Sequence, residues 1–158
     1  MYFITVVALT FLLPVGFTIW ELIVAPGANV VLSFGKWTAF FAVGVRLFIA
    51  GLRQALQPNA TLRQSFDIED AAPAPIVQEL GFANLAMGAM GLLALLHPLL
   101  TFAAALMGGL FYGLAGLKQG LSKQRNFDRN LSMTTDLWAF VVLALYAGWG
   151  FGAVAALM

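Results

Sequence analysis

The chain has 158 residues, of which 61% are hydrophobic and only 9% are charged, with a formal net charge of +1. Soluble domains carry about 25% charged residues, and a small soluble domain has too much surface to bury this much apolar side chain. The composition therefore predicts a single transmembrane domain over residues 1–158. With no cysteine and one histidine in the sequence, we expect no disulfide, metal site, cofactor or nucleic-acid partner.

Five stretches are long enough to cross the hydrocarbon core as helices, which takes roughly 20 largely apolar residues. In chain order they lie at about residues 3–24, 37–56, 76–96, 99–117 and 137–158. The predicted fold class is all-α, a polytopic bundle of five transmembrane helices; four helices are the alternative if two stretches fuse or one is discarded. The first stretch contains Pro14 and follows no basic segment, which favours a retained helix over a cleaved signal peptide.

The distribution of basic residues predicts the orientation in the lipid bilayer. If the loops alternate between the two faces, one face collects Arg53, Arg63, Lys118, Lys123, Arg125 and Arg129. The other face has only Lys36 near a helix end. Because basic loops remain cytoplasmic, we expect a multi-pass membrane protein with its amino terminus in the cytoplasm and its carboxyl terminus outside. We further expect the membrane to be a bacterial inner membrane, so that the carboxyl terminus lies in the periplasm.

The two longer loops carry charges that have two interpretations each. In the 57–75 loop, Asp67, Glu69 and Asp70 form either a weak site for a hard cation or a solvated acidic turn, and their spacing matches no calcium loop. The basic residues of the 118–135 loop either bind anionic lipid headgroups or simply follow the positive-inside rule. The sequence contains no nucleophile, phosphate-loop or zinc-protease motif, so no enzyme activity is predicted.

Small residues repeat on one face of each of the last three stretches. The positions are Gly81, Asn84, Gly88 and Gly91; Gly109, Gly113, Gly116 and Gly120; and Ala144, Gly148 and Gly152. Helices in lipid associate by close packing, and small side chains allow their backbones to approach. We expect these faces to pack within the chain, with a homo-oligomer or another membrane subunit as the alternative partner.

Arg46 is the most informative polar residue. It lies nine residues into the second stretch, roughly 14 Å deep at about 1.5 Å per residue, and at that depth it needs a partner, a cavity or a bound anion. Asn84 is expected within its reach. The antiparallel second and third helices are expected to bring Arg53 level with Glu79 as an ion pair.

The remaining intramembrane charges are expected elsewhere. Asp136 and Lys118 join the predicted Arg53–Glu79 layer near the cytoplasmic face. Glu21 is expected near Lys36, with Arg46 as its alternative partner. No carboxylate is clearly level with Arg46. The candidate ligand-binding residues are Arg46, Arg53, Glu79, Asn84 and Asp136. The same residues could instead form interhelical contacts that only fix the register of the helices.

The stretch from Gln78 to Gly88, QELGFANLAMG, resembles a family of small bacterial multi-span membrane proteins of unknown function. Asn130 and Asp136 stand where the pattern of that family has an asparagine and an aspartate before the last helix. The family commonly has a histidine where this chain has Lys118 and Gln119, which argues against a histidine-based role. A weaker similarity, to DoxX-like four-helix proteins, rests on size and hydropathy. Neither resemblance implies an activity.

Three functions follow from this pattern. The first is binding or transport of a small ligand, an ion or a lipid headgroup around Arg46, Glu79 and Asn84. The second is a non-catalytic accessory subunit that packs on a larger membrane complex. The third is a lipid-modifying enzyme that uses Glu79 or Asp136 in acid–base chemistry, for which no sequence signature is present.

The predicted topology can be tested with a reporter fused after Met158. A reporter that is active only in the periplasm should be active there, because an odd number of helices separates the two termini and the basic loops fix the amino terminus inside. Activity of a cytoplasm-only reporter at the same position would contradict the predicted orientation.

Overall fold

The computed structural model describes residues 2–63, 68–122 and 127–155, and all regular secondary structure in these ranges is helical. Five helices there are long and apolar enough to cross a membrane. They are Phe3–Val24, Val30–Leu56, Ala74–Leu93, Pro98–Leu121 and Asn130–Gly150. The predicted all-α fold with five membrane-spanning helices is therefore confirmed.

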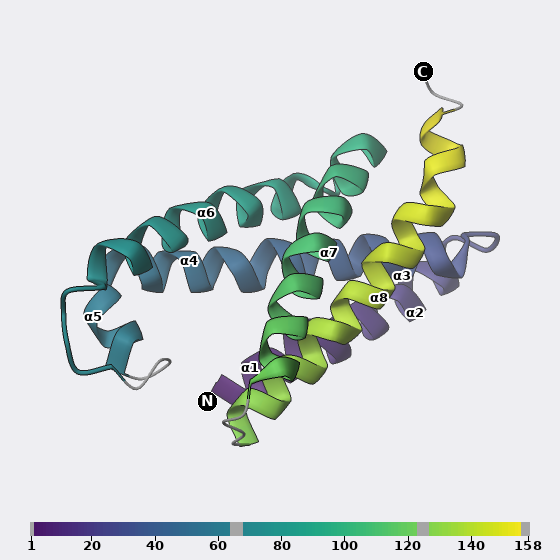
Figure 1. Cartoon of the computed structure of the whole chain (residues 1–158). Helices are drawn as coiled ribbons and strands as arrows, with labels where there is room; N and C mark the ends of the chain where they lie inside the picture. The colour runs from purple at the N-terminus through teal and green to yellow at the C-terminus, as the bar shows by residue number, and fades with distance from the viewer. Residues whose placement is uncertain (1, 64–67, 123–126, 156–158) are drawn as a thin grey trace.

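The first two of these helices each contain a π-helical segment. The elements are α1 (Tyr2–Val7), η1 (Ala8–Leu12), α2 (Leu13–Val24), α3 (Val30–Thr38), η2 (Ala39–Arg46), α4 (Leu47–Leu56), α5 (Pro58–Thr61), α6 (Ala74–Leu93), α7 (Pro98–Leu121) and α8 (Phe127–Ala155). In Figure 1, α4 and α6 lie side by side, and α7 and α8 form a second pair that crosses the first steeply. The helix of α1, η1 and α2 packs along α3 and η2.

Each π-helical segment has an identifiable cause. Pro14 lacks an N–H, and its ring would clash with the carbonyl of residue 10 in a regular α-helix; the wider turn of η1 ends just before it. In η2 the carbonyl of Ala42 accepts a hydrogen bond from the Tyr112 hydroxyl of α7. A side chain inserted into the backbone ladder is a recognised cause of helix distortion, and π segments occur often at functional sites.

The glycines of α6 pack directly against the backbone of the second membrane helix. A Cβ added to Gly91 would lie 2.3 Å from the nitrogen of Gly44, and one added to Gly81 would lie 2.6 Å from the nitrogen of Ala55. Gly88 has the same relation to the backbone of Phe48. The predicted packing of this face within the chain is confirmed.

The glycines of α7 serve the contact with α8. A Cβ added to Gly113 would meet the Phe140 ring at 2.8 Å, and one added to Gly116 would meet the Leu137 side chain at the same distance. The face of α8 around Gly148 behaves differently, because nothing lies within 4 Å of an added Cβ there. Intramolecular packing thus accounts for two of the three predicted small-residue faces.

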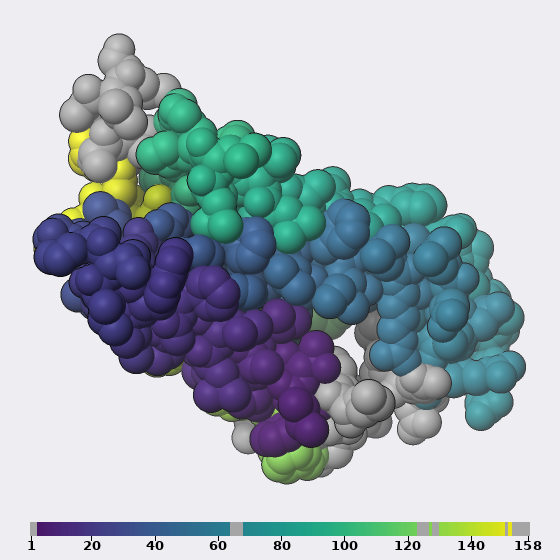
Figure 2. Space-filling model, turned by 180° about the vertical axis from the view of Figure 1, so that it is seen from behind, coloured from purple at the N-terminus to yellow at the C-terminus, as the bar shows by residue number. Residues whose placement is uncertain are grey.

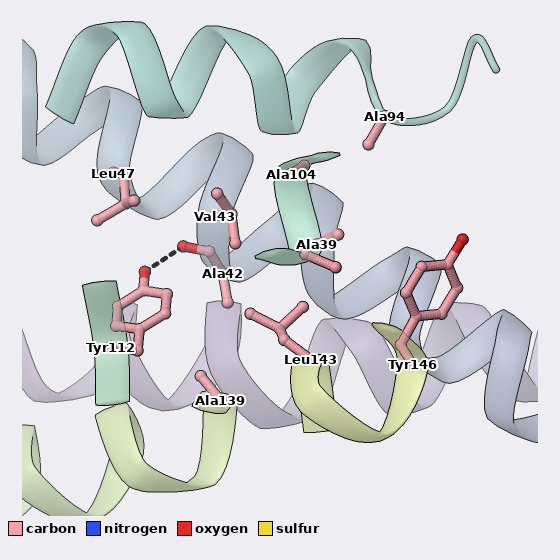
Figure 3. Packing of buried hydrophobic residues seen from close by; sticks show 11 residues of the cluster. Ala39, Ala42, Val43, Leu47, Ala94, Ala104, Tyr112, Ala139, Leu143 and Tyr146 are labelled. Carbon is pink, nitrogen blue, oxygen red and sulfur yellow. Dashed lines mark hydrogen bonds between the residues drawn. The ribbon is translucent and has the colours of Figure 1, made fainter. Parts of the chain in front are cut away.

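The largest buried apolar cluster lies where η2, α7 and α8 meet (Figure 3). Ala42, Val43, Ala139 and Leu143 are all fully buried in it. Gly108 of α7 sits against the Val43 side chain, so small residues bring the three helices together around η2. This close packing positions the polar residues described below.

The tight contact at Gly91 can be tested by substitution. Gly91→Ala should lower the free energy of unfolding by about 1–3 kcal/mol, because the new methyl group meets backbone that cannot move aside cheaply. Gly148→Ala is the matched control; it should be neutral or slightly stabilising, since alanine is favoured over glycine in a helix by about 1 kcal/mol. Reversible unfolding in mixed detergent micelles measures both values, and equal effects would contradict the packing described here.

Candidate functional site

Arg46 and Asp136 form a buried ion pair. The Nη2 of Arg46, the last residue of η2, donates to Oδ1 of Asp136 on α8 at 2.8 Å, and the two side chains are 13% and 6% exposed. The pair joins residues 90 positions apart in the sequence. It therefore ties the second membrane helix to the last one.

The expectation that no carboxylate lies level with Arg46 is wrong. Asp136 was expected at the membrane face because the apolar stretch begins near residue 137. The helix α8 begins much earlier, at Phe127, and its membrane-spanning part begins at Asn130 rather than near residue 137. Asp136 therefore lies six residues inside the spanning helix, roughly 9 Å along its axis, where it pairs with Arg46.

Three further side chains surround the pair. Gln119 Nε2 of α7 donates to Oδ2 of Asp136 at 3.0 Å, and Ser132 Oγ makes a longer hydrogen bond of 3.5 Å to the same oxygen. The guanidinium carbon of Arg46 lies 5.1 Å from the centre of the Tyr112 ring, a distance suited to a cation–π interaction. Both carboxylate oxygens of Asp136 therefore accept hydrogen bonds, and the Arg46 guanidinium lies beside the Tyr112 ring.

The local sequence explains how these groups converge. Tyr112 and Gln119 are seven residues apart on α7, so they share one helix face, and Ser132 is one turn before Asp136 on α8. Gly116 lies between the two α7 residues and allows α8 to approach closely. Tyr112 also holds the carbonyl of Ala42 in η2, as Figure 3 shows. One tyrosine therefore supports both the π-helical segment and the arginine that ends it.

Gln119 has a second feature that bears on chemistry. Its Oε1 is buried and has no hydrogen-bond partner among the described residues. The side-chain amide therefore has an unused acceptor next to a carboxylate that already receives its N–H group. A hydrogen-bond donor placed here, such as a protonated carboxyl group, would find an acceptor.

The predicted Arg53–Glu79 ion pair is not formed. The helices α4 and α6 pack with Gly51 against the backbone of Leu85 and Gly81 against that of Ala55. This register places Arg53 about one helical turn away from Glu79 along the interface, and both side chains are exposed. The apolar stretches correctly predict that α4 and α6 are antiparallel. They do not predict the register of the two helices, which the glycine contacts set.

Asn84 contacts a different residue from the one expected. It is buried, and its Nδ2 donates to Oε1 of Gln54 at 2.7 Å. This hydrogen bond links α6 to α4, whereas Arg46 is held by α7 and α8. Asn84 therefore contributes to helix packing, which was the structural interpretation of its glycine-lined face.

Glu21 forms the second ion pair of the described chain, with Lys36 as predicted. Lys36 Nζ lies 2.5 Å from Glu21 Oε1, and the indole N–H of Trp37 donates to the other carboxylate oxygen at 2.7 Å. This cluster joins α2 to α3 near the turn that connects them. It is separate from the Arg46–Asp136 pair.

Of the three acidic residues in the 57–75 loop, the structure describes only Glu69 and Asp70. Asp67 lies outside the described residues. Glu69 and Asp70 are exposed, and Asp70 Oδ1 accepts a hydrogen bond from the backbone N–H of Ala72 at 3.0 Å. Within the ranges that the structure describes, no three His, Cys, Asp or Glu side chains are grouped to hold a metal ion.

Arg46 and Asp136 were predicted from the sequence as candidate site residues, whereas Tyr112, Gln119 and Ser132 were not. Tyr112 and Gln119 could have been found from their seven-residue spacing on the glycine face of α7. Gln119, one of the two residues at the place discussed for the family's histidine, contacts Asp136 in this structure.

A family model described as DUF6790, a family of unknown function, matches residues 3–147. The chain belongs to this family. The match covers all the residues of the site from Arg46 to Asp136, so the ion pair lies within the part of the chain that the DUF6790 model describes. No curated protein and no solved structure matches the chain.

Removing Arg46 and removing Asp136 should lower the free energy of unfolding by different amounts. Breaking a buried pair typically costs about 3–5 kcal/mol because a lone charge is left buried. After Arg46→Leu, Asp136 can become neutral by taking up a proton; after Asp136→Leu, Arg46 cannot lose its charge. We therefore expect Asp136→Leu to destabilise the protein more than Arg46→Leu does.

The double variant Arg46→Leu with Asp136→Leu completes this test. It should recover much of the lost stability, since no buried charge remains. Unfolding in mixed micelles measures all four proteins. Additive losses in the double variant would contradict a direct pair.

Proposed function

We propose that this chain is a small polytopic membrane protein that binds a small anion together with a proton at Arg46 and Asp136, and that this binding serves its transport or sensing. The observation that carries the proposal is the 2.8 Å ion pair between buried side chains of two membrane-spanning helices. Ionisable side chains at such depth are costly and commonly mark ion pathways and proton relays. The proposed setting is a bacterial inner membrane with the amino terminus in the cytoplasm.

Charge balance supports an anion rather than a cation as the ligand. In the resting protein the charges of Arg46 and Asp136 cancel. If Asp136 takes up a proton, the guanidinium loses its counter-charge, and a bound monovalent anion restores neutrality. The site then holds no net charge in either state, which apolar surroundings require.

The surroundings of Asp136 suit both protonation states. Gln119 donates its N–H to the ionised carboxylate at 3.0 Å, and its Oε1 has no partner among the described residues. After rotation of this amide, the same side chain can accept the O–H of the protonated carboxyl group. Tyr112, at 5.1 Å, would keep the guanidinium in place while its partner changes.

An accessory subunit remains the second candidate, favoured by one observation. Gly148 and Gly152 lie on an exposed face of α8 where nothing approaches within 4 Å of an added Cβ. In lipid such a face allows close approach of another helix. A larger complex that dissociates on Gly148→Leu, with no loss from Arg46 or Asp136 variants, would favour this function over anion binding.

Proton uptake tests the anion site directly. Purified protein in weakly buffered detergent solution with a pH indicator is titrated with potassium chloride, nitrate or sulfate. We expect at least one monovalent salt to cause stoichiometric proton uptake. Asp136→Asn should bind the same anion without proton uptake and with little dependence on pH, because its neutral amide already leaves Arg46 available.

The double variant Arg46→Leu with Asp136→Leu is the control for non-specific salt effects and should take up no protons. Equal proton uptake by the original protein and by Asp136→Asn would contradict the proposal. Absence of uptake with all three salts would contradict it as well.

A further inference from the structure

The outward surface of the first membrane helix contains an open apolar depression of about 330 Å³. It is lined by Leu12, Leu13, Gly16, Phe17 and Trp20. Its volume is at the lower end of the range of about 300–1,000 Å³ found for small-molecule sites. Nothing lies within 4 Å of a Cβ added to Gly16, so this glycine leaves the depression open. The helix that carries it runs across the outer face seen in Figure 2.

Paired charges lie at the Trp20 end of this depression. Glu21 follows Trp20 directly, and its carboxylate is held by Lys36 at 2.5 Å with side chains that are 19% and 30% exposed. The Trp37 ring connects the two features, since its centre is 4.8 Å from that of Phe17 and 5.2 Å from the Lys36 ammonium. The depression therefore runs from the apolar part of α2 to a pair of accessible opposite charges.

The position of the pair corresponds to the lipid headgroup layer. Glu21 is three residues before the end of α2 at Val24, which is roughly 5 Å along the axis. Trp20, which is 55% exposed, is of the residue type that concentrates at membrane interfaces. Hydrocarbon would then surround the depression itself, and headgroups would surround the charges.

The apolar depression and the Glu21–Lys36 pair together indicate which kind of molecule binds here. An acyl chain fits an apolar depression within a membrane-spanning segment. The ammonium of Lys36 has three donors, and Glu21 takes only one of them, so the others can bind a phosphate. A lipid ammonium can approach the Glu21 carboxylate and the Trp20 ring. Because the charges of Lys36 and Glu21 cancel, the pair matches a zwitterionic headgroup better than an anionic one.

We infer that this depression binds one phospholipid with an amine-bearing zwitterionic headgroup, its acyl chain lying along Gly16 and its phosphate on Lys36. This site shares no residue with the Arg46–Asp136 pair. Its existence does not depend on the proposed anion site.

Native mass spectrometry of the purified protein, equilibrated with equal amounts of phosphatidylethanolamine and phosphatidylglycerol, tests this inference. The original protein should retain one phosphatidylethanolamine in preference to phosphatidylglycerol. Gly16→Phe fills the depression and should lower retention by about tenfold, the effect of losing about two buried methylene contacts. Gly148→Phe, at an equally open glycine of α8, should retain the lipid and is the matched control.

The headgroup is tested separately with Lys36→Gln, which should keep an acyl-chain contact but lose the preference between the two lipids. Gly16→Leu provides a smaller filling variant, and unchanged unfolding of both Gly16 variants establishes that they fold. Equal retention by Gly16→Phe, Gly16→Leu and the original protein would overturn the site. A preference for phosphatidylglycerol in the original protein would overturn the assignment of a zwitterionic headgroup.

Discussion

The structure depends on one constraint: an arginine in the middle of a membrane helix must have its charge satisfied by the protein. Arg46 cannot lose its proton, and an uncompensated charge at that depth is costly. The Asp136 carboxylate supplies the opposite charge, with its Oδ1 2.8 Å from Nη2 of Arg46. The last helix carries Asp136 to Arg46 by packing closely on α7, and the glycines of α7 that face α8 allow this approach. The electrostatic requirement and the small-residue packing are therefore two parts of the same arrangement.

Tyr112 links this pair to the backbone. Its ring lies beside the guanidinium, and its hydroxyl group binds the carbonyl of Ala42 within η2. The π-helical segment, which ends at Arg46, is thus supported by the side chain that also contacts the arginine. Protonation of Asp136 would change the contacts of Arg46 and Tyr112. Because Tyr112 also binds the backbone of η2, protonation would then alter the conformation of the second membrane helix.

Much of the fold follows from the sequence, because hydrocarbon requires long apolar helices and little else. The five helices, the internal packing of the α6 and α7 glycines and the Glu21–Lys36 contact could all be predicted. The register could not. Glycine contacts that exist only after folding set α4 against α6 and separate Arg53 from Glu79. The position of Asp136 was misjudged because the most apolar stretch begins near residue 137, whereas the membrane-spanning helix already begins at Asn130 with polar residues.

The most direct test of the ion pair is the protonation state of Asp136 near neutral pH, measured by infrared difference spectroscopy. In the original protein Asp136 should contribute a carboxylate signal and no carboxylic-acid C=O band, because Arg46 holds it ionised. In Arg46→Leu a carboxylic-acid band should appear, and it should disappear again when Asp136→Asn is added. A carboxylic-acid band from Asp136 in the original protein at neutral pH would contradict the ion pair on which this account rests.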